Sequence, residues 1–161
     1  WSPVTAIWVM VPLPSCATSK EQKFMTNPVE DKPMPPLNRE TKPFWDSMKE
    51  HNMRLQRCAD CGKIRHYPRP VCDSCLSMNS EWVRASGKGT VHSWTVSHHA
   101  FHPAFLADLP LTLVTVDLEE GVRICAQMRD VKPDGLSIDM PVKLGYEDAT
   151  ADVTLPVFYP A

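Results

Sequence analysis

The stretch CADCGKIRHYPRPVCDSC, from Cys58 to Cys75, decides the fold of this 161-residue chain. It holds two Cys-x-x-Cys pairs that are separated by ten residues. Each short loop of this kind turns two sulfurs and several backbone N–H groups toward one ion, and four thiolates complete a tetrahedral shell. Because no coordination position is left for water, we expect a structural zinc rather than a catalytic one. The predicted zinc ligands are Cys58, Cys61, Cys72 and Cys75.

Other chemistry of these cysteines stays open at this point. An iron site of the rubredoxin type uses the same four sulfurs, and two disulfides are the oxidised alternative. Thioredoxin-like redox chemistry requires one pair inside a βαβ unit, which the sequence does not show. The remaining cysteines, Cys16 and Cys125, are expected to be spectators rather than nucleophiles. Ligand spacing favours a reducing compartment, so we expect a cytoplasmic protein.

Residues 1–36 are interpreted as a leader followed by an extended arm. The apolar stretch at residues 4–11 is shorter than the about 20 residues that cross a bilayer. A signal peptide would need a basic region that is missing here, although residues 13–16 loosely resemble a lipoprotein cleavage site. We expect Met25 to be the native start and residues 1–24 to be upstream or added sequence. Residues 27–36 are proline-rich and polar, the composition of an extended arm.

Residues 37–56 are predicted to hold an amphipathic helix that spans positions 41–56. Thr41 would cap this helix, and Pro43 suits its first turn. Its buried face would be formed by residues that recur every three or four positions, namely Phe44, Met48, His51 and Leu55. Phe44 and Trp45 give a short helix a large aromatic surface. They are expected either to pack on the protein's own core or to anchor a partner or cap a ligand groove.

Residues 85–161 are predicted to form a five-stranded barrel after a zinc ribbon at residues 57–84. The predicted strands are 89–99, 111–118, 122–128, 142–146 and 153–159. Alternation is clearest in the third strand, whose inward residues would be Val122, Ile124, Ala126 and Met128. Glu119-Glu120-Gly121 suits a short hairpin with positive φ at Gly121. Five short strands with a longer excursion after the third are typical of an OB-fold, so the predicted class is mainly β.

Net charge argues against two classes of partner. The chain has 17 Lys and Arg residues against 19 Asp and Glu residues, for a formal net charge of −2. This balance provides no broad attraction to phosphate backbones or to anionic membranes. We therefore expect neither nucleic acid nor a membrane as a partner.

Histidines near the first barrel strand are the remaining candidates for chemistry. They are His92, His98, His99 and His102. No Asp or Glu accompanies them in ligand spacing, and no Ser or Cys lies in a nucleophile motif. We expect no catalytic residue and interpret His98 and His99 as packing or contact residues. The adjoining apolar segment with Phe101 and Phe105 is of the sort that a partner commonly buries.

A basic cluster lies beside the cysteine pairs. It comprises Arg57, Lys63, Arg65, His66 and Arg69. Such a cluster either meets a phosphate group or forms an ordinary solvated ribbon surface. Arg65 and Arg69 are the residues of this cluster that we expect to contact a partner or a phosphate-bearing ligand.

The order of these motifs resembles one known family. The short helix with Phe44-Trp45 is followed by LQRCADCGKIRHYPRPVCDSCLS, by SGKGTVHSWTVSHH, and by the Glu120-Gly121-Val122-Arg123 turn. Together they are similar to the small proteins that pair a rubredoxin-like zinc ribbon with an OB-fold and accompany thiolase-superfamily enzymes acting on acyl-CoA. The resemblance covers residues 37–158.

This resemblance implies an accessory subunit in a hetero-oligomer. Relatives of this type bridge the thiolase and HMG-CoA synthase of the archaeal mevalonate pathway, form the aldolase that shortens steroid side chains, and partner the thiolase that cleaves benzoylsuccinyl-CoA. In each, the thiolase-like chain carries the catalytic residues, and the OB-fold chain stabilises it and helps enclose the CoA thioester. The resemblance therefore implies structural zinc, a thiolase-superfamily partner and an acyl-CoA substrate of the complex.

Two other functions stay open from the residues alone. A nucleic-acid-binding OB-fold would need a basic strand face interleaved with aromatic residues, whereas the third barrel strand offers Arg123 and Arg129 without an aromatic. A stand-alone acyl-CoA hydrolase or acyltransferase would act through the histidines and Cys125 and would turn over without a partner.

Overall fold

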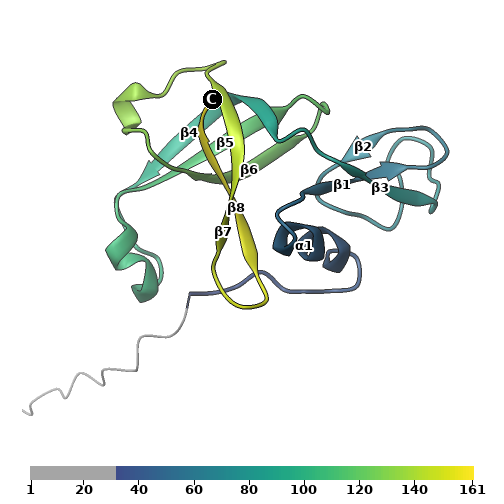
Figure 1. Ribbon diagram of the computed structural model, residues 1–161, viewed down its shortest axis with the longest axis horizontal. Helices are drawn as coiled ribbons and strands as arrows, with labels where there is room; N and C mark the ends of the chain where they lie inside the picture. Colours follow the sequence, from purple (N-terminus) through teal and green to yellow (C-terminus); the bar gives the residue numbers. More distant parts are fainter. Residues whose placement is uncertain (1–31) are drawn as a thin grey trace, which may run out of the picture.

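The computed structural model describes residues 32–161, and these form a three-stranded ribbon sheet beside a closed barrel (Figure 1). The expected leader, the start at Met25 and Cys16 lie outside the described residues. The helix and the ribbon strands are α1 (Lys42–Lys49), β1 (Arg54–Cys58), β2 (Ile64–Arg65) and β3 (Ser80–Arg84). The barrel is built from β4 (Lys88–Ser97), η1 (Pro103–Asp108), β5 (Leu111–Leu118), β6 (Arg123–Met128), η2 (Pro133–Gly135), β7 (Pro141–Asp148) and β8 (Thr154–Pro160).

The barrel confirms the predicted OB-fold. Its strand order is β4-β5-β6-β8-β7, and pairing of β4 with β7 closes it. The contact between β6 and β8 is parallel, and the other neighbours are antiparallel. Every second residue of β5 and β6 is buried, because alternate side chains of a strand point to opposite faces. The buried set includes Val122, Ile124, Ala126 and Met128, as predicted.

Two glycines permit specific features of the barrel. Gly121 has a φ of 74° and closes the β5–β6 hairpin through a 2.9 Å bond from its N–H to the Leu118 carbonyl. Gly89 lies on β4 close against its neighbouring strand β5, where a Cβ atom would stand 2.6 Å from the Asp117 carbonyl oxygen. A side chain at either position would strain the backbone or collide with it.

The helix is shorter than the sequence predicted. It ends at Lys49, and His51 has a φ of 52°, which stops the helical path. Leu55, expected on the helix, belongs to β1 and is 1% exposed. Pro43 does lie in the first turn, but the Thr41 side chain makes no capping bond and instead donates to the Asn38 side chain at 2.8 Å.

The helix, ribbon and barrel share one hydrophobic core. Phe44 and Met48 of α1 join the same buried cluster as Val91 of the barrel. Two contacts of Tyr146 on β7 also join the barrel to the segment after the helix. The Met53 N–H donates to the Tyr146 hydroxyl at 3.0 Å, and the His51 ring stacks on the Tyr146 ring with ring centres 5.0 Å apart. The ribbon therefore depends on the barrel for much of its packing.

The described part of the arm lies along the barrel. Residues 32–38 have no regular secondary structure. Lys32 forms a 2.6 Å ion pair with Asp108 of η1, and its ammonium lies 5.6 Å from the centre of the Phe105 ring. Among the described residues, no helix is long and apolar enough to cross a membrane.

Candidate functional site

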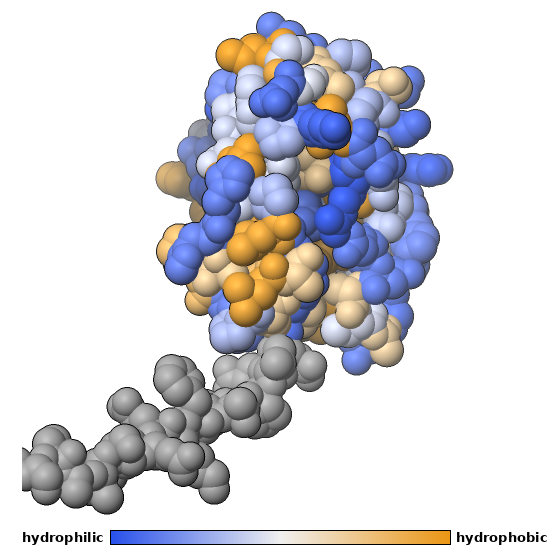
Figure 2. All heavy atoms as spheres, turned by 90° about the vertical axis from the view of Figure 1, so that its left-hand side faces the viewer, coloured by the Kyte–Doolittle hydropathy of each residue, from blue (hydrophilic) through white to orange (hydrophobic). Residues whose placement is uncertain are grey.

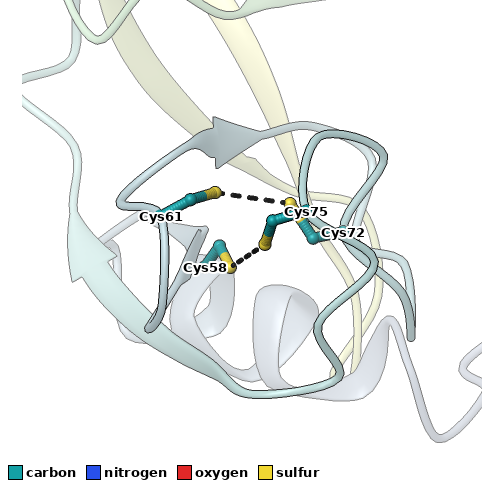
Figure 3. Close-up of side chains that lie close together, drawn as sticks. All are labelled: Cys58, Cys61, Cys72 and Cys75. Carbon is teal, nitrogen blue, oxygen red and sulfur yellow. Dashed lines mark hydrogen bonds between the residues drawn. The ribbon is translucent and has the colours of Figure 1, made fainter.

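The four cysteines of the two motifs converge at one point of the ribbon (Figure 3). Their sulfurs all lie within 4.8 Å of one another, and the Cys58–Cys75 and Cys61–Cys72 pairs are each 3.6 Å apart. Zinc–thiolate bonds of about 2.3 Å in a tetrahedron place sulfurs about 3.8 Å apart. All four thiols are free, and these separations are far from a disulfide bond of about 2 Å. The four cysteines form a zinc-ribbon site consistent with a structural zinc.

Two knuckles with the same backbone pattern carry these cysteines. In the first knuckle, residues 58–63, the Cys58 N–H donates to the Lys63 carbonyl and the Gly62 N–H donates back to the Cys58 carbonyl. In the second, residues 72–77, the Cys72 N–H donates to the Ser77 carbonyl and the Leu76 N–H donates back to the Cys72 carbonyl. Each knuckle is thus closed by a reciprocal pair of backbone bonds that holds its two sulfurs on one side.

Backbone amides favour the thiolate form at the two buried cysteines. The N–H groups of Cys75 and Ser74 lower the pKa of the Cys72 thiol to about 6, although burial acts in the opposite direction. The Cys61 N–H likewise lowers the pKa of Cys58. Since zinc binds thiolates, these amides suit the first steps of metal binding.

The other two thiols show why a cation fits the cluster. The Ser77 N–H lowers the pKa of Cys75, but contacts with Cys58 and Cys61 outweigh it and raise that pKa to about 12. Four thiolates this close repel one another, because like charges disfavour a second ionisation. A bound dication would remove this conflict, so the donor set fits zinc by both geometry and charge.

Side chains also connect the two knuckles. Lys63 pairs with Asp73 at 2.7 Å, and the Ser77 hydroxyl donates to the Asp60 carboxylate. The Asn79 amide reaches the same carboxylate at 3.3 Å. None of these contacts was predicted, because sequence spacing does not show which residues of two separate loops face each other.

The basic cluster divides into buried and exposed members. Arg65 is 6% exposed, with its Nε donating to Gln56 at 2.7 Å and its Nη2 donating to the Arg69 carbonyl at 3.1 Å. Arg65 therefore braces the ribbon, and its expected contact with a partner does not fit this burial. Arg69 is exposed and stays a candidate contact. Arg57 is paired with Glu81, which leaves less free positive charge than the sequence suggested.

His66 is a residue whose environment the sequence did not reveal. Its ring lies 5.1 Å from the Phe44 ring and 4.0 Å from the Tyr67 ring. Within the described part of the chain, neither ring nitrogen has a hydrogen-bond partner, and both are buried. Burial lowers the pKa of His66 to about 4. A neutral, buried His66 thus forms part of the contact between α1 and the ribbon.

The aromatic pair of the helix is mostly structural. Phe44 is 2% exposed and lies in the core, so it is not available to a partner. Trp45 is half-buried, packs against the same core, and contacts Phe44 edge to face with ring centres 5.1 Å apart. Trp45 keeps a partly exposed surface next to the core and stays a candidate contact.

The predicted apolar loop forms a groove on the side of the barrel away from the ribbon. This groove, which we call the loop groove, has a volume of about 690 Å³. Its lining includes His98, His99, Phe101, Phe105, Leu111 and Leu113. Phe101 is 91% exposed and Leu106, on η1, is 65% exposed. Figure 2 shows the hydrophobic area that these residues give to this face of the molecule.

Comparison with solved structures then decides the family. The chain is 38% identical to a chain of the Ltp2-ChsH2(DUF35) aldolase, with a TM-score of 0.73, over 79% of this chain and 98% of that chain. The chain belongs to the ChsH2/DUF35 family. The ChsH2 rubredoxin-like zinc ribbon model matches residues 45–79, and the model of the ChsH2 C-terminal OB-fold domain matches residues 82–147.

Curated relatives of this chain include two hydratase alpha subunits and a scaffold protein. The chain is 38% identical over 142 residues to a probable enoyl-CoA hydratase alpha subunit of Thermomonospora curvata, and 40% identical over 114 residues to the 3-oxo-4,17-pregnadiene-20-carboxyl-CoA hydratase alpha subunit of Mycobacterium tuberculosis. These matches cover 88% and 71% of this chain but only 44% and 36% of the two subunits. A DUF35 domain-containing scaffold protein of Methanocaldococcus jannaschii is 34% identical over 101 residues, 62% of this chain and 71% of the scaffold.

A second polar cluster, formed by His92, Asp117 and Arg123, lies on the outside of the barrel. Arg123 binds Asp117 at 2.6 Å, and His92 lies 3.2 Å from the same carboxylate. All three side chains are about half exposed, and Cys125 on β6 is exposed as well. In this part of the described structure, His92 contacts Arg123 and Asp117 rather than Cys125, so the surface lacks an assembled nucleophile and base.

Proposed function

We propose that this chain is a non-catalytic accessory subunit of a thiolase-like acyl-CoA enzyme that cleaves or forms a carbon–carbon bond. The observation that carries the proposal is the match to 98% of a chain in the Ltp2-ChsH2(DUF35) aldolase at 38% identity. An aldolase acts on a carbon–carbon bond, and a chain matched almost end to end is expected to keep the same place in an assembly. The scaffold relative supports an assembling role as well.

The kinds of site in the described structure support a binding role for this chain and a catalytic role for its partner. The cysteine site has four protein ligands and no open position, so its chemistry is structural. His98 and His99 line the loop groove, and His92 pairs with Asp117 on the exposed surface of the barrel. Such a chain can bind and position, while the reacting groups come from the partner.

Zinc would be held by Cys58, Cys61, Cys72 and Cys75 in this proposal. Bound zinc would supply cross-links between loops that have little packing of their own. Cys58 and Cys72 are fully buried, while Cys61 and Cys75 are exposed. A site of this type requires reduced thiols, which supports a reducing compartment such as the cytoplasm.

The loop groove is the proposed contact with the thiolase-like subunit. Phe101 has the exposure of an interface anchor, because a large aromatic ring that is 91% exposed gains most from burial by a partner. His98, His99 and Phe105 line the same groove. Trp45 and Arg69 lie on the α1 and ribbon side, where they are proposed to meet the acyl-CoA or a second surface of the partner.

A second candidate is an accessory subunit of an acyl-CoA hydratase. The matches to two hydratase alpha subunits favour it, one of them named for a steroid-derived acyl-CoA. This chain spans less than half the length of either subunit, so the matches support the role of only that part of those proteins. The two candidates share the accessory role and differ in the reaction of the partner.

Turnover assays with and without a partner test the proposal. The chain is co-purified with the thiolase-like protein encoded nearest to it, and acyl-CoA consumption is followed for carbon–carbon cleavage and for hydration. We expect no turnover by this chain alone and carbon–carbon cleavage by the complex. Hydration by the complex would favour the second candidate. Turnover by the isolated chain would contradict both.

A further inference from the structure

The second knuckle, residues 72–77, has no strand pairing of its own. It lies in the long connection between β2 and β3, whereas the first knuckle is anchored to β1 and β2. The sulfurs of each knuckle must nevertheless stay within 4.8 Å of those of the other. Contacts between the knuckles therefore decide how well the four sulfurs keep their positions.

Two polar bridges make this connection in a reciprocal way. Lys63 closes the first knuckle with its carbonyl, at 2.9 Å from the Cys58 N–H, and holds Asp73 of the second knuckle with its ammonium at 2.7 Å. Ser77 closes the second knuckle with its carbonyl, at 2.8 Å from the Cys72 N–H, and donates its hydroxyl to Asp60 of the first. Each bridging residue thus fixes its own knuckle by its backbone and the other knuckle by its side chain.

We propose that the Lys63–Asp73 and Ser77–Asp60 bridges hold the two cysteine knuckles together and slow the release of the metal. Lys63, Asp73, Ser77 and Asp60 are positioning residues, since they act through the four thiols. This inference rests on the proposed zinc site and extends it to the residues that control its lability.

The physical basis is preorganisation. A metal with four thiolate ligands leaves only when one knuckle moves away from the other, and the bridges resist that movement without contacting the ion. Contacts outside the ligand shell commonly change metal affinity about 10- to 100-fold. The Lys63 and Asp73 side chains are 44% and 47% exposed, so salt should screen their attraction. The Ser77–Asp60 hydrogen bond should respond less to salt.

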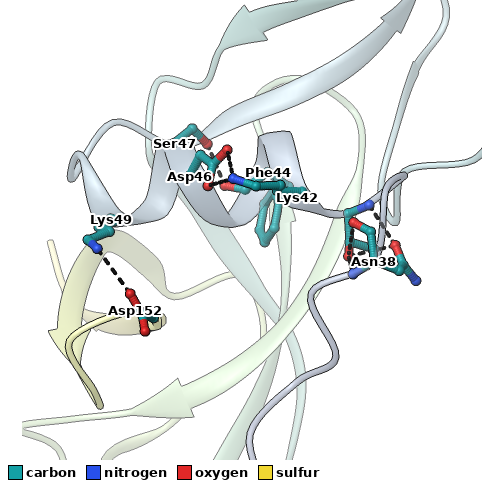
Figure 4. Close-up of polar contacts among 8 residues, drawn as sticks. Asn38, Lys42, Phe44, Asp46, Ser47, Lys49 and Asp152 are labelled. Carbon is teal, nitrogen blue, oxygen red and sulfur yellow. Dashed lines mark hydrogen bonds and ion pairs between the residues drawn. The ribbon is translucent and has the colours of Figure 1, made fainter.

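Zinc transfer to a chromophoric chelator, measured with the full chain, tests the proposal. We expect roughly tenfold faster release from Lys63→Gln and from Ser77→Ala. The Lys63→Arg variant should restore slow release, because it keeps a cation opposite Asp73. The effect of Lys63→Gln should shrink at high salt. Lys42→Gln is the matched control, since it removes another exposed ion pair of 2.7 Å, with Asp46 on α1 (Figure 4).

Two further measurements separate positioning from general destabilisation. The tetrathiolate absorption bands of the cobalt-substituted variants should keep their parent positions, which shows that all four ligands remain bound. The thermal unfolding midpoint of the zinc-loaded chain should shift no more in Lys63→Gln than in Lys42→Gln. Suppose that a Lys63→Gln/Ser77→Ala double variant binds zinc and releases it at the rate of the parent. That result would contradict the proposed role of the bridges but leave the zinc site supported. A parent chain that binds no zinc would overturn the metal site as well.

Discussion

Gly62 and Leu76 occupy equivalent positions in the two cysteine knuckles, and both have a left-handed backbone, with φ values of 74° and 61°. Each donates its N–H to the carbonyl of the first cysteine of its knuckle at 3.0 Å. Glycine adopts this conformation without penalty, whereas a side chain costs about 1–2 kcal/mol. Leu76 is 76% exposed, so burial within this chain does not offset that cost.

Replacing Leu76 by glycine should stabilise the zinc-loaded protein. The relief of left-handed strain exceeds the added entropy of glycine in the unfolded chain, which leaves a gain of about 0.5–1 kcal/mol. Chemical denaturation at constant zinc measures the free energy of unfolding. Leu76→Ala is the control, because it removes the apolar side chain but keeps the strain. A destabilised Leu76→Gly variant would show that the leucine side chain contributes to the fold.

Loss of one buried ligand should destabilise the whole molecule. Cys72→Ser removes a fully buried thiolate, and a structural zinc site contributes folding free energy of several kcal/mol. Because the ribbon shares its core with the barrel, the thermal unfolding midpoint of both should fall together. The matched control is Cys125→Ser, an exposed position on the barrel, which should keep the parent zinc content and midpoint. An unchanged midpoint in Cys72→Ser would argue against a structural metal.

His66 should make stability depend on pH in a defined window. Its pKa is about 4 in the folded chain and 6.5 in the unfolded chain, so between these values only the unfolded state gains the proton. Stability from this residue is therefore complete above pH 6.5 and is lost as the pH falls toward 4. The full loss corresponds to about 3 kcal/mol.

The His66→Phe variant isolates this effect. It keeps an aromatic ring against Phe44 and removes the titrating group, so its free energy of unfolding should depend less on pH between 6.5 and 4 than that of the parent. Both proteins share the protonation of the zinc thiolates, so its effect drops out when the pH dependence of the free energy of unfolding is compared between them. His51→Gln, at an exposed ring, is the control. Parallel curves for parent and His66→Phe would refute the assignment.

The loop groove should decide binding of the catalytic partner. Phe101→Ser removes an exposed apolar group of its lining and is expected to weaken the complex by at least about 1 kcal/mol, the scale of an interface anchor. Ile138→Ser is the control, since Ile138 is another large exposed apolar residue but does not line the groove. Affinity is measured by titration of the isolated subunits. Equal losses in Ile138→Ser and Phe101→Ser would remove the groove from the interface.

The sequence predicted the barrel better than the helix for a physical reason. Alternation in β5 and β6 reports burial on one face directly, so their bounds agree within a residue. The three-to-four-residue spacing of apolar residues extends from Met48 to Leu55, so the sequence predicted one helix. Leu55 is instead a buried residue of strand β1, and its spacing from Met48 matches a helix only by chance. The helix ends at Lys49, and the left-handed backbone that follows is at His51, where no glycine or proline marks the end in the sequence.

For the candidate site, the sequence predicted features that depend on nearby residues and missed those that depend on residues far apart in the chain. Cysteine spacing is local, and it identified the four sulfurs that meet in space. The burial of Arg65 and His66 depends on Gln56 and Phe44, which come from other elements, so their roles were not visible in the sequence. The bridges of Lys63 and Ser77 join two loops and were missed for the same reason.

Native mass spectrometry with metal analysis tests the central claim most directly. This chain would be co-expressed with the thiolase-like protein encoded nearest to it, and the intact assembly would be weighed. We expect a stable heteromer that carries one zinc per copy of this chain. A zinc-containing monomer that does not associate with the thiolase-like protein would contradict it.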